Sequence, residues 1–154
     1  NKGDKMKDKV VKELNRFLTG IHMGGVTFKD YLDKAENLEL KECLREIIES
    51  FKRHEEAITH RIEQLGGNAS DSLGIRGNIA EFFEKLSLIP IDTDSEVCEQ
   101  AIKAMHMGIK NANKFIEENE NMKESILNDI NGVVKDYDNH LFKLNNLNTK
   151  LSKN

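Results

Sequence analysis

The sequence predicts an all-α protein, a four-helix bundle made of two related antiparallel hairpins joined by a long crossover. Apolar residues recur at three- and four-residue steps over four long segments, the spacing of an amphipathic helix. The 154 residues are 38% hydrophobic and 32% charged and include one proline. Such a composition is typical of a helical bundle and argues against a β-rich or disordered chain.

A repeated pattern relates the two halves of the chain. The tripeptide His-Met-Gly begins at His22 and again at His106, 84 residues later. An aromatic residue then precedes a histidine by three positions in each half, Phe51 before His54 and Tyr137 before His140, and these histidines are 86 residues apart. Because the two features repeat after nearly the same number of residues, we interpret the pattern as a duplicated helical hairpin.

Four segments carry an apolar stripe, a row of apolar residues on one helix face. We expect helices over about residues 4–33, 39–65, 94–118 and 122–151. Asn37 is expected to cap the second helix. Thr93 with Glu96, and Asn121 with Glu124, form capping-box patterns for the third and fourth. Short links within each hairpin make its two helices antiparallel neighbours.

The two hairpins are joined by a long connection over about residues 66–93. It begins with Gly66 and Gly67, and we expect a glycine in the left-handed backbone conformation to end the second helix there. A short amphipathic helix is expected over about 75–87, and Pro90 breaks the chain after it. A long crossover between hairpins is the ferritin-like arrangement, not a simple up-down-up-down bundle. By its length, the chain 1–154 is expected to form one domain.

Glycines within the predicted helices need an explanation, since each costs about 1 kcal/mol relative to alanine. Gly24 and Gly108 occupy equivalent places in the repeat and face inward. We expect them to let the first and third helices pass unusually close to each other.

Charge and hydropathy limit the classes of partner. The net charge of −4 comes from finely interleaved acids and bases without a basic stripe, which argues against nucleic acid. No apolar run approaches the roughly 20 residues of a membrane span. Cys43 and Cys98 lie on apolar stripes without metal-ligand spacing, and no secretory signal is visible. We expect a cytoplasmic protein with reduced thiols, whose partner is a protein, a second copy of the chain included.

The histidines are the candidate metal ligands. His54 and His140 are in line with their apolar stripes and are expected to point inward, whereas His22 and His106 lie one residue off theirs. Neutral imidazole binds zinc, copper, iron and nickel, and Asp136 shares a helix face with His140. These five residues form the candidate site for a transition metal. The alternative is that a tyrosine, a carboxylate or a buried water satisfies the inward histidines and no cofactor binds.

Short motifs along the chain carry a family resemblance. They are Leu14-Asn15-Arg16-Phe17-Leu18, Gly20-Ile21-His22-Met23-Gly24, Glu39-Leu40-Lys41, His54, Arg61-Ile62-Glu63-Gln64-Leu65-Gly66-Gly67 and Met107-Gly108-Ile109. Together with the amphipathic crossover, they make the chain from Val10 to Leu151 resemble a bacterial ferritin-like four-helix-bundle family that is known only as a domain of unknown function.

The resemblance implies the fold and raises the question of a metal centre. Ferritin-like di-iron proteins use a glutamate from each of two helices and Glu-x-x-His from the other two. The four glutamate positions are occupied here by Ile21, Phe51, Met105 and Tyr137. Only the histidines of the two pairs remain, as His54 and His140. The resemblance therefore implies that the fold carries over and that ferroxidase or oxidase activity does not.

Three functions are compatible with this reading. The first is a non-enzymatic ferritin-like bundle with a structural, stress-related or assembly role. The second is a metal-binding protein that uses core histidines without ferroxidase activity. A hemerythrin-like iron site ranks last, because it needs several histidines within single helices and only His54 and His60 share one. No phosphate-binding loop and no Ser-His-Asp arrangement can be proposed, so the balance favours a protein that is not an enzyme.

Overall fold

Four long helices lie side by side in the computed structural model, which describes residues 1–70, 81 and 84–153. The helices are α1 (Lys2–Lys34), α2 (Leu38–Gln64), α4 (Asp94–Glu118) and α5 (Glu124–Ser152). No strand occurs within the described ranges. Among the described helices, none combines the length and the apolar character that a bilayer span requires.

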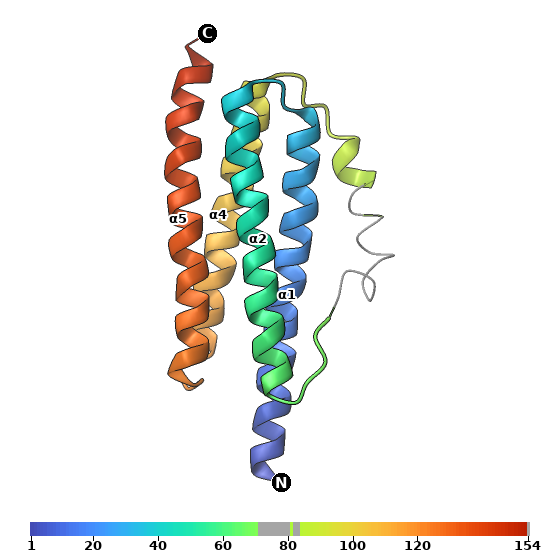
Figure 1. The fold of residues 1–154 in the computed structure, drawn as a ribbon, viewed down its shortest axis with the longest axis vertical. Coiled ribbons are helices and arrows are strands. Elements are labelled where there is room, and N and C mark those ends of the chain that lie inside the picture. The colour runs from blue at the N-terminus through green and yellow to red at the C-terminus, as the bar shows by residue number, and fades with distance from the viewer. Residues whose placement is uncertain (71–80, 82–83, 154) are drawn as a thin grey trace.

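The order and direction of the helices are those of a ferritin-like bundle. α1 packs on α2 and α4 on α5, while α1 also contacts α4 and α2 contacts α5. Figure 1 shows that α2 and α4 run in the same direction, so the connection between them must return along the length of the bundle. The Asp94 carboxylate, in the first turn of α4, accepts hydrogen bonds from the backbone N–H groups of Glu36 and Asn37 at 2.8 and 3.1 Å. The predicted fold class is confirmed.

Local signals at three helix ends act as the sequence predicts. The Asn37 side chain accepts a hydrogen bond from the Leu40 N–H at 2.9 Å and caps α2. Gly66 has a φ of 78°, the left-handed conformation expected after that helix. Thr93 Oγ1 accepts from the Glu96 N–H at 3.1 Å at the start of α4.

The fourth helix begins differently from the prediction. α5 starts at Glu124 with Lys123 in the N-cap position and without a side-chain cap, so the expected capping box of Asn121 with Glu124 is wrong. Asn121 lies two residues before the cap position. The short helix expected over about 75–87 falls largely outside the described residues, although residues 84–87 are helical.

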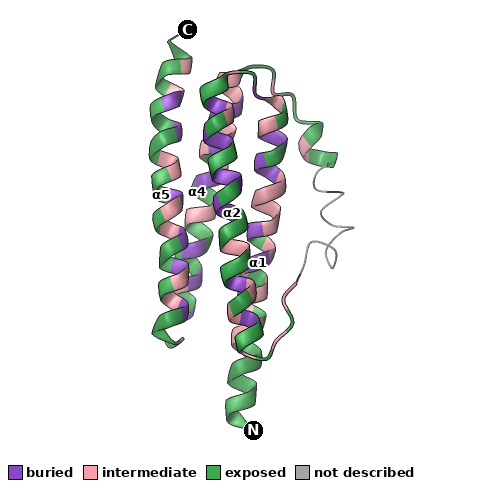
Figure 2. Ribbon diagram, viewed as in Figure 1, coloured by how far each residue is buried: buried purple, intermediate pink, exposed green. Residues whose placement is uncertain are grey.

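The core runs along the inward faces of the four helices. Figure 2 shows buried residues on the faces that meet, while the first turns of α1 are exposed. The largest fully buried side chains are Phe28, Leu14, Leu18, Leu40, Leu44, Ile47, Ile58, Ile62, Met105, Ile126, Ile130 and Leu144. Burial of each such side chain contributes about 1.5–3 kcal/mol, and this contribution stabilises the bundle more than helix propensity does.

Polar side chains of α1 hold the described ends of the crossover. Asn15 donates from Nδ2 to the Asn68 carbonyl at 2.9 Å, and its Oδ1 accepts from the Ser70 N–H at 2.7 Å. Near the other end of α1, Lys34 donates from Nζ to the Leu86 carbonyl at 3.1 Å. These contacts attach both ends of the connection to the same helix.

Candidate functional site

The centre of the bundle is filled with apolar and aromatic side chains. Ile21, Phe51, Met105 and Tyr137, the four positions at which the resemblance implies glutamates, are between 1% and 5% exposed. The rings of Phe51 and Tyr137 meet edge to face with centroids 5.6 Å apart. Alkyl, thioether, phenyl and phenol groups do not supply the bridging carboxylates of a di-iron centre. The residues present therefore do not fit that cofactor.

Each of the two inward glycines makes room for one of these rings. A β-carbon on Gly24 would lie 3.2 Å from Cζ of Phe51, and one on Gly108 would lie 3.0 Å from Cε2 of Tyr137. The expectation that these glycines let α1 and α4 approach each other is wrong. The closest neighbour of each is an aromatic side chain from the other helix of the same hairpin.

His54 lies beside a carboxylate. Its Nε2 is buried and stands 3.0 Å from Asp136 Oδ2, and no hydrogen bond of good geometry reaches this nitrogen from the described residues. Burial lowers the pKa of His54, and the nearby Asp136 charge opposes this shift only in part. His54 is therefore a neutral imidazole beside a carboxylate. Both residues line an open groove of about 450 Å³ between α2 and α5.

His140 is bonded to a serine that the sequence did not single out. Its Nε2 lies 2.8 Å from Ser50 Oγ, and Ser50 donates its hydroxyl proton to the Ile47 carbonyl at 2.7 Å. Ser50 must therefore accept from His140, which places the imidazole proton on Nε2. Burial lowers the pKa of His140 as well. Ser50 is fully buried, so the pair does not form a nucleophile that a substrate could reach.

The other two candidate histidines lie elsewhere. His22 has Nδ1 at 3.0 Å from Glu55 Oε1 and Nε2 at 3.0 Å from the Ser70 carbonyl, so it links α1, α2 and the crossover. His106 is exposed on α4. Within the described ranges, no group of three or more histidine, cysteine, aspartate or glutamate side chains is arranged to hold a metal ion.

The five predicted candidates are thus divided into three places. Asp136 lies close enough to His54 and His140 for its charge to act on the pKa of both, while His22 and His106 are apart from them. Ser50 was detectable in principle, because it precedes His54 by four residues on the same helix face.

A second groove has Tyr137 in its lining. It is a groove of about 280 Å³ lined chiefly by α1 and α4, with the aromatic rings of Phe17, Phe115 and Tyr137 among its walls. Sequence reasoning missed it, because its two walls come from helices that lie far apart in the chain.

Comparisons with known proteins agree with this architecture. A protein-family model described as "Domain of unknown function (DUF2383)" matches residues 9–118. The crystal structure of a two-domain protein from Anabaena variabilis, with DJ-1/ThiJ/PfpI-like and ferritin-like domains, is similar with a TM-score of 0.77 and 20% identity. The alignment covers 94% of this chain and 40% of that one, and at this identity it supports the fold alone. No curated protein matches the sequence.

Proposed function

The chain belongs to the DUF2383 family, and from that premise we propose that it is a non-enzymatic ferritin-like helical bundle with a structural, stress-related or assembly role. The observation that carries the proposal is the filled bundle centre. Phe51 and Tyr137 pack against each other at 5.6 Å, at two positions where the resemblance implies acidic ligands. Side chains of this kind fill the centre by close packing, and they supply no carboxylates to hold metal ions that react with oxygen.

We also infer that the two hairpins derive from one duplicated hairpin. The supporting feature is a pair of matched contacts, Gly24 with Phe51 and Gly108 with Tyr137, each of which places an aromatic ring over a glycine of the neighbouring helix. The glycines of the two contacts are 84 residues apart and the aromatic residues are 86 apart, which is nearly the offset between the two His-Met-Gly sequences.

The partner that we propose is a protein, with a second copy of this chain as the first candidate. We assign the contact to two large apolar side chains that are exposed, Met107 of α4 at 65% and Phe142 of α5 at 67%. We place the protein in the cytoplasm, a location supported by the two unpaired thiols Cys43 and Cys98.

Three measurements test the leading proposal. Elemental analysis of protein purified without a chelator or an affinity tag should find no stoichiometric metal, and ferrous iron should oxidise no faster than in buffer. Sedimentation equilibrium should show an oligomer that Met107→Ser with Phe142→Ser weakens. Met6→Ser is the matched control, because Met6 is also exposed, at 62%, but lies in the first turns of α1. A ferroxidase burst contradicts the non-enzymatic role, and a monomeric wild type contradicts self-association.

One observation favours a second candidate, a metal-binding protein without ferroxidase activity. The unpartnered Nε2 of His54 stands 3.0 Å from Asp136 Oδ2. Two ligand atoms at about 2.1 Å from a tetrahedral zinc ion stand about 3.4 Å apart, so these two side chains would have to separate by only about 0.4 Å to share one ion. The lowered pKa of His54 favours the neutral imidazole at neutral pH, the form that binds a metal.

Calorimetric titration with Zn²⁺ or Co²⁺ tests this candidate. His54→Ala and Asp136→Asn should each abolish binding, whereas His106→Ala should leave it unchanged, because His106 is exposed on another helix. Binding that His106→Ala removes, or a wild type that binds neither ion, rules the candidate out.

A further inference from the structure

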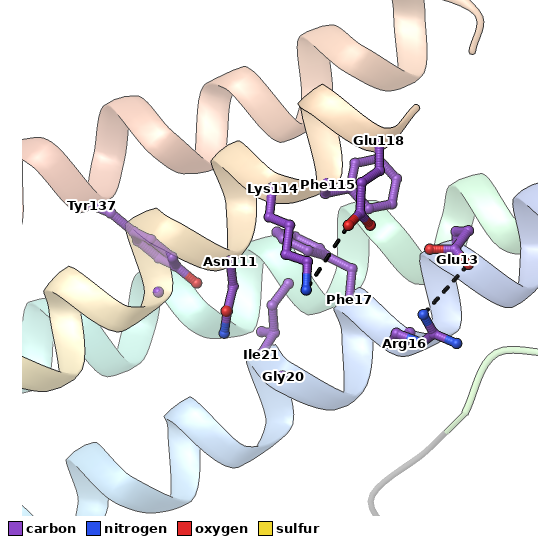
Figure 3. A pocket seen from close by; sticks show the side chains of 11 residues that line it. Glu13, Arg16, Phe17, Gly20, Ile21, Asn111, Lys114, Phe115, Glu118 and Tyr137 are labelled. Carbon is purple, nitrogen blue, oxygen red and sulfur yellow. Dashed lines mark ion pairs between the residues drawn. The ribbon is translucent and has the colours of Figure 1, made fainter. Parts of the chain in front are cut away.

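The groove between α1 and α4 has the features of a small-molecule site. Its volume is about 280 Å³, and Phe17 of α1 faces Phe115 of α4 with ring centroids 5.5 Å apart. Ile21 and Tyr137 add apolar surface from the bundle centre. Figure 3 shows these side chains around one hollow, with charged residues at its edge. Pockets that bind small molecules combine such apolar walls with a few polar groups.

A glycine keeps the groove open on the α1 side. Gly20 lines the groove, and a β-carbon built on it would meet no atom within 4 Å. The helix therefore lacks a side chain at a place where one would fit without a clash. Since glycine costs about 1 kcal/mol in a helix relative to alanine, the open space has an energetic cost that packing does not explain.

Tyr137 presents a polar group to this hollow. The residue is 4% exposed and is one of those that line the groove. Figure 3 shows the hydroxyl directed toward Asn111. Burial raises the pKa of Tyr137, with a smaller contribution from the Asp136 charge, so the phenol stays protonated and can donate. A molecule that displaces water from the groove must therefore offer this donor an acceptor.

The charges at the edge of the groove cancel within each helix. Arg16 lies 3.7 Å from Glu13, and Lys114 lies 3.9 Å from Glu118. Exposed pairs of this kind are weak, but two cations and two carboxylates leave the edge without net charge. The edge thus favours a ligand without net charge.

We propose that the groove binds a small uncharged molecule with one or two aromatic rings and a hydroxyl or carbonyl group. The rings pack against the faces of Phe17 and Phe115 that line the groove, and the polar group accepts from the Tyr137 hydroxyl and meets the Asn111 amide at the mouth. A cavity of about 150 Å³ is sufficient for benzene, so 280 Å³ suits two fused rings. This role needs no metal and does not depend on the function proposed above.

Fluorescence and calorimetric titration with 2-naphthol test the proposal. Wild-type protein should bind one molecule per chain, and Gly20→Leu should weaken binding at least tenfold because the new side chain fills the groove. Gly132→Leu is the matched control: a β-carbon on Gly132 also meets nothing within 4 Å, but this residue of α5 does not line the groove. It should bind like the wild type. Thermal unfolding monitored by circular dichroism establishes that both variants fold.

Two further arms test the chemistry of the ligand. Tyr137→Phe should weaken 2-naphthol binding about three- to tenfold, the effect of one hydrogen bond, and leave naphthalene binding unchanged. The anion 2-naphthoate should bind more weakly than 2-naphthol. The proposal is overturned if the wild type does not bind 2-naphthol or if Gly20→Leu binds it equally well. A preference for the anion, or an unchanged affinity in Tyr137→Phe, overturns the assigned ligand class.

Discussion

The ring of Tyr137 lies directly over the backbone of Gly108, so that a β-carbon on this glycine would stand 3.0 Å from Cε2 of the ring. Tyr137 cannot easily move away, because it is 4% exposed and also packs on the ring of Phe51. The contact explains why a residue with poor helix propensity stands in the middle of α4. The same ring is part of the lining of the α1–α4 groove.

Gly108→Ala should therefore lower the free energy of unfolding by about 1 kcal/mol. The clash costs about 1–3 kcal/mol, and the gain in helix propensity of up to about 1 kcal/mol offsets part of it. Urea denaturation measures the change. Gly20→Ala is the control and should stabilise the protein by about 0.4–1 kcal/mol, because its β-carbon meets nothing. Equal effects of the two substitutions would show that the ring does not press on Gly108.

Asn15→Ala should loosen the start of the crossover. It removes the hydrogen bonds to the Asn68 carbonyl and from the Ser70 N–H, and we expect a loss of about 1–3 kcal/mol. Hydrogen exchange of the Ser70 amide should become faster. Asn15→Asp keeps the acceptor for Ser70 and removes the donor to Asn68, so an intermediate effect is expected. Unchanged exchange in Asn15→Ala would mean that other contacts hold this segment.

Stability should fall as the pH drops below about 6.5, the usual histidine pKa in an unfolded chain. Burial lowers the folded-state pKa values of His54 and His140. Below pH 6.5, the unfolded chain therefore binds more protons at these two histidines than the folded protein does. Each histidine contributes a slope of at most about 1.4 kcal/mol per pH unit, and the stability that this linkage provides is fully present above pH 6.5.

Urea denaturation at pH 7.5, 6.5 and 5.5 measures this dependence. The double variant His54→Gln with His140→Gln should flatten it over that window. His106→Gln should keep the wild-type slope, because His106 is exposed. A double variant with the full wild-type slope would assign the pH dependence to other groups.

The two thiols should be unreactive in the folded protein. Burial raises the pKa of Cys43 to about 11 and that of Cys98 to about 12, and the thiolate is the reactive form. Alkylation by iodoacetamide at pH 8 should modify neither thiol within the time that labels both in urea. Rapid labelling of the native protein would contradict the burial of these side chains.

Helix ends were predictable where the signal lies within one turn. Asn37 caps α2 through Leu40, three residues away, and Gly66 ends that helix through its own backbone conformation. The same reasoning failed at Asn121, because α5 begins only at Glu124. A capping pattern in the sequence does not specify which residue begins the helix, since packing against neighbouring helices also selects the first turn.

The candidate site was predictable only in part. Periodicity alone identifies His54 and His140 as inward-facing residues. The partner of each ring nitrogen depends on neighbours far along the chain: Ser50 lies 90 residues from His140, and Ser70 lies 48 residues from His22. Spacing in the sequence contains no information about contacts of this kind.

The sequence by itself determined the four helices, the long crossover and the apolar filling of the centre, because helix periodicity and side-chain chemistry are local properties. Only the tertiary structure decided that the Tyr137 ring packs against Gly108 where the backbone of another helix was expected. It also decided that His106 faces solvent and that a groove opens beside Gly20. These features depend on how far helices rotate and approach one another, which is set by the packing of all four together.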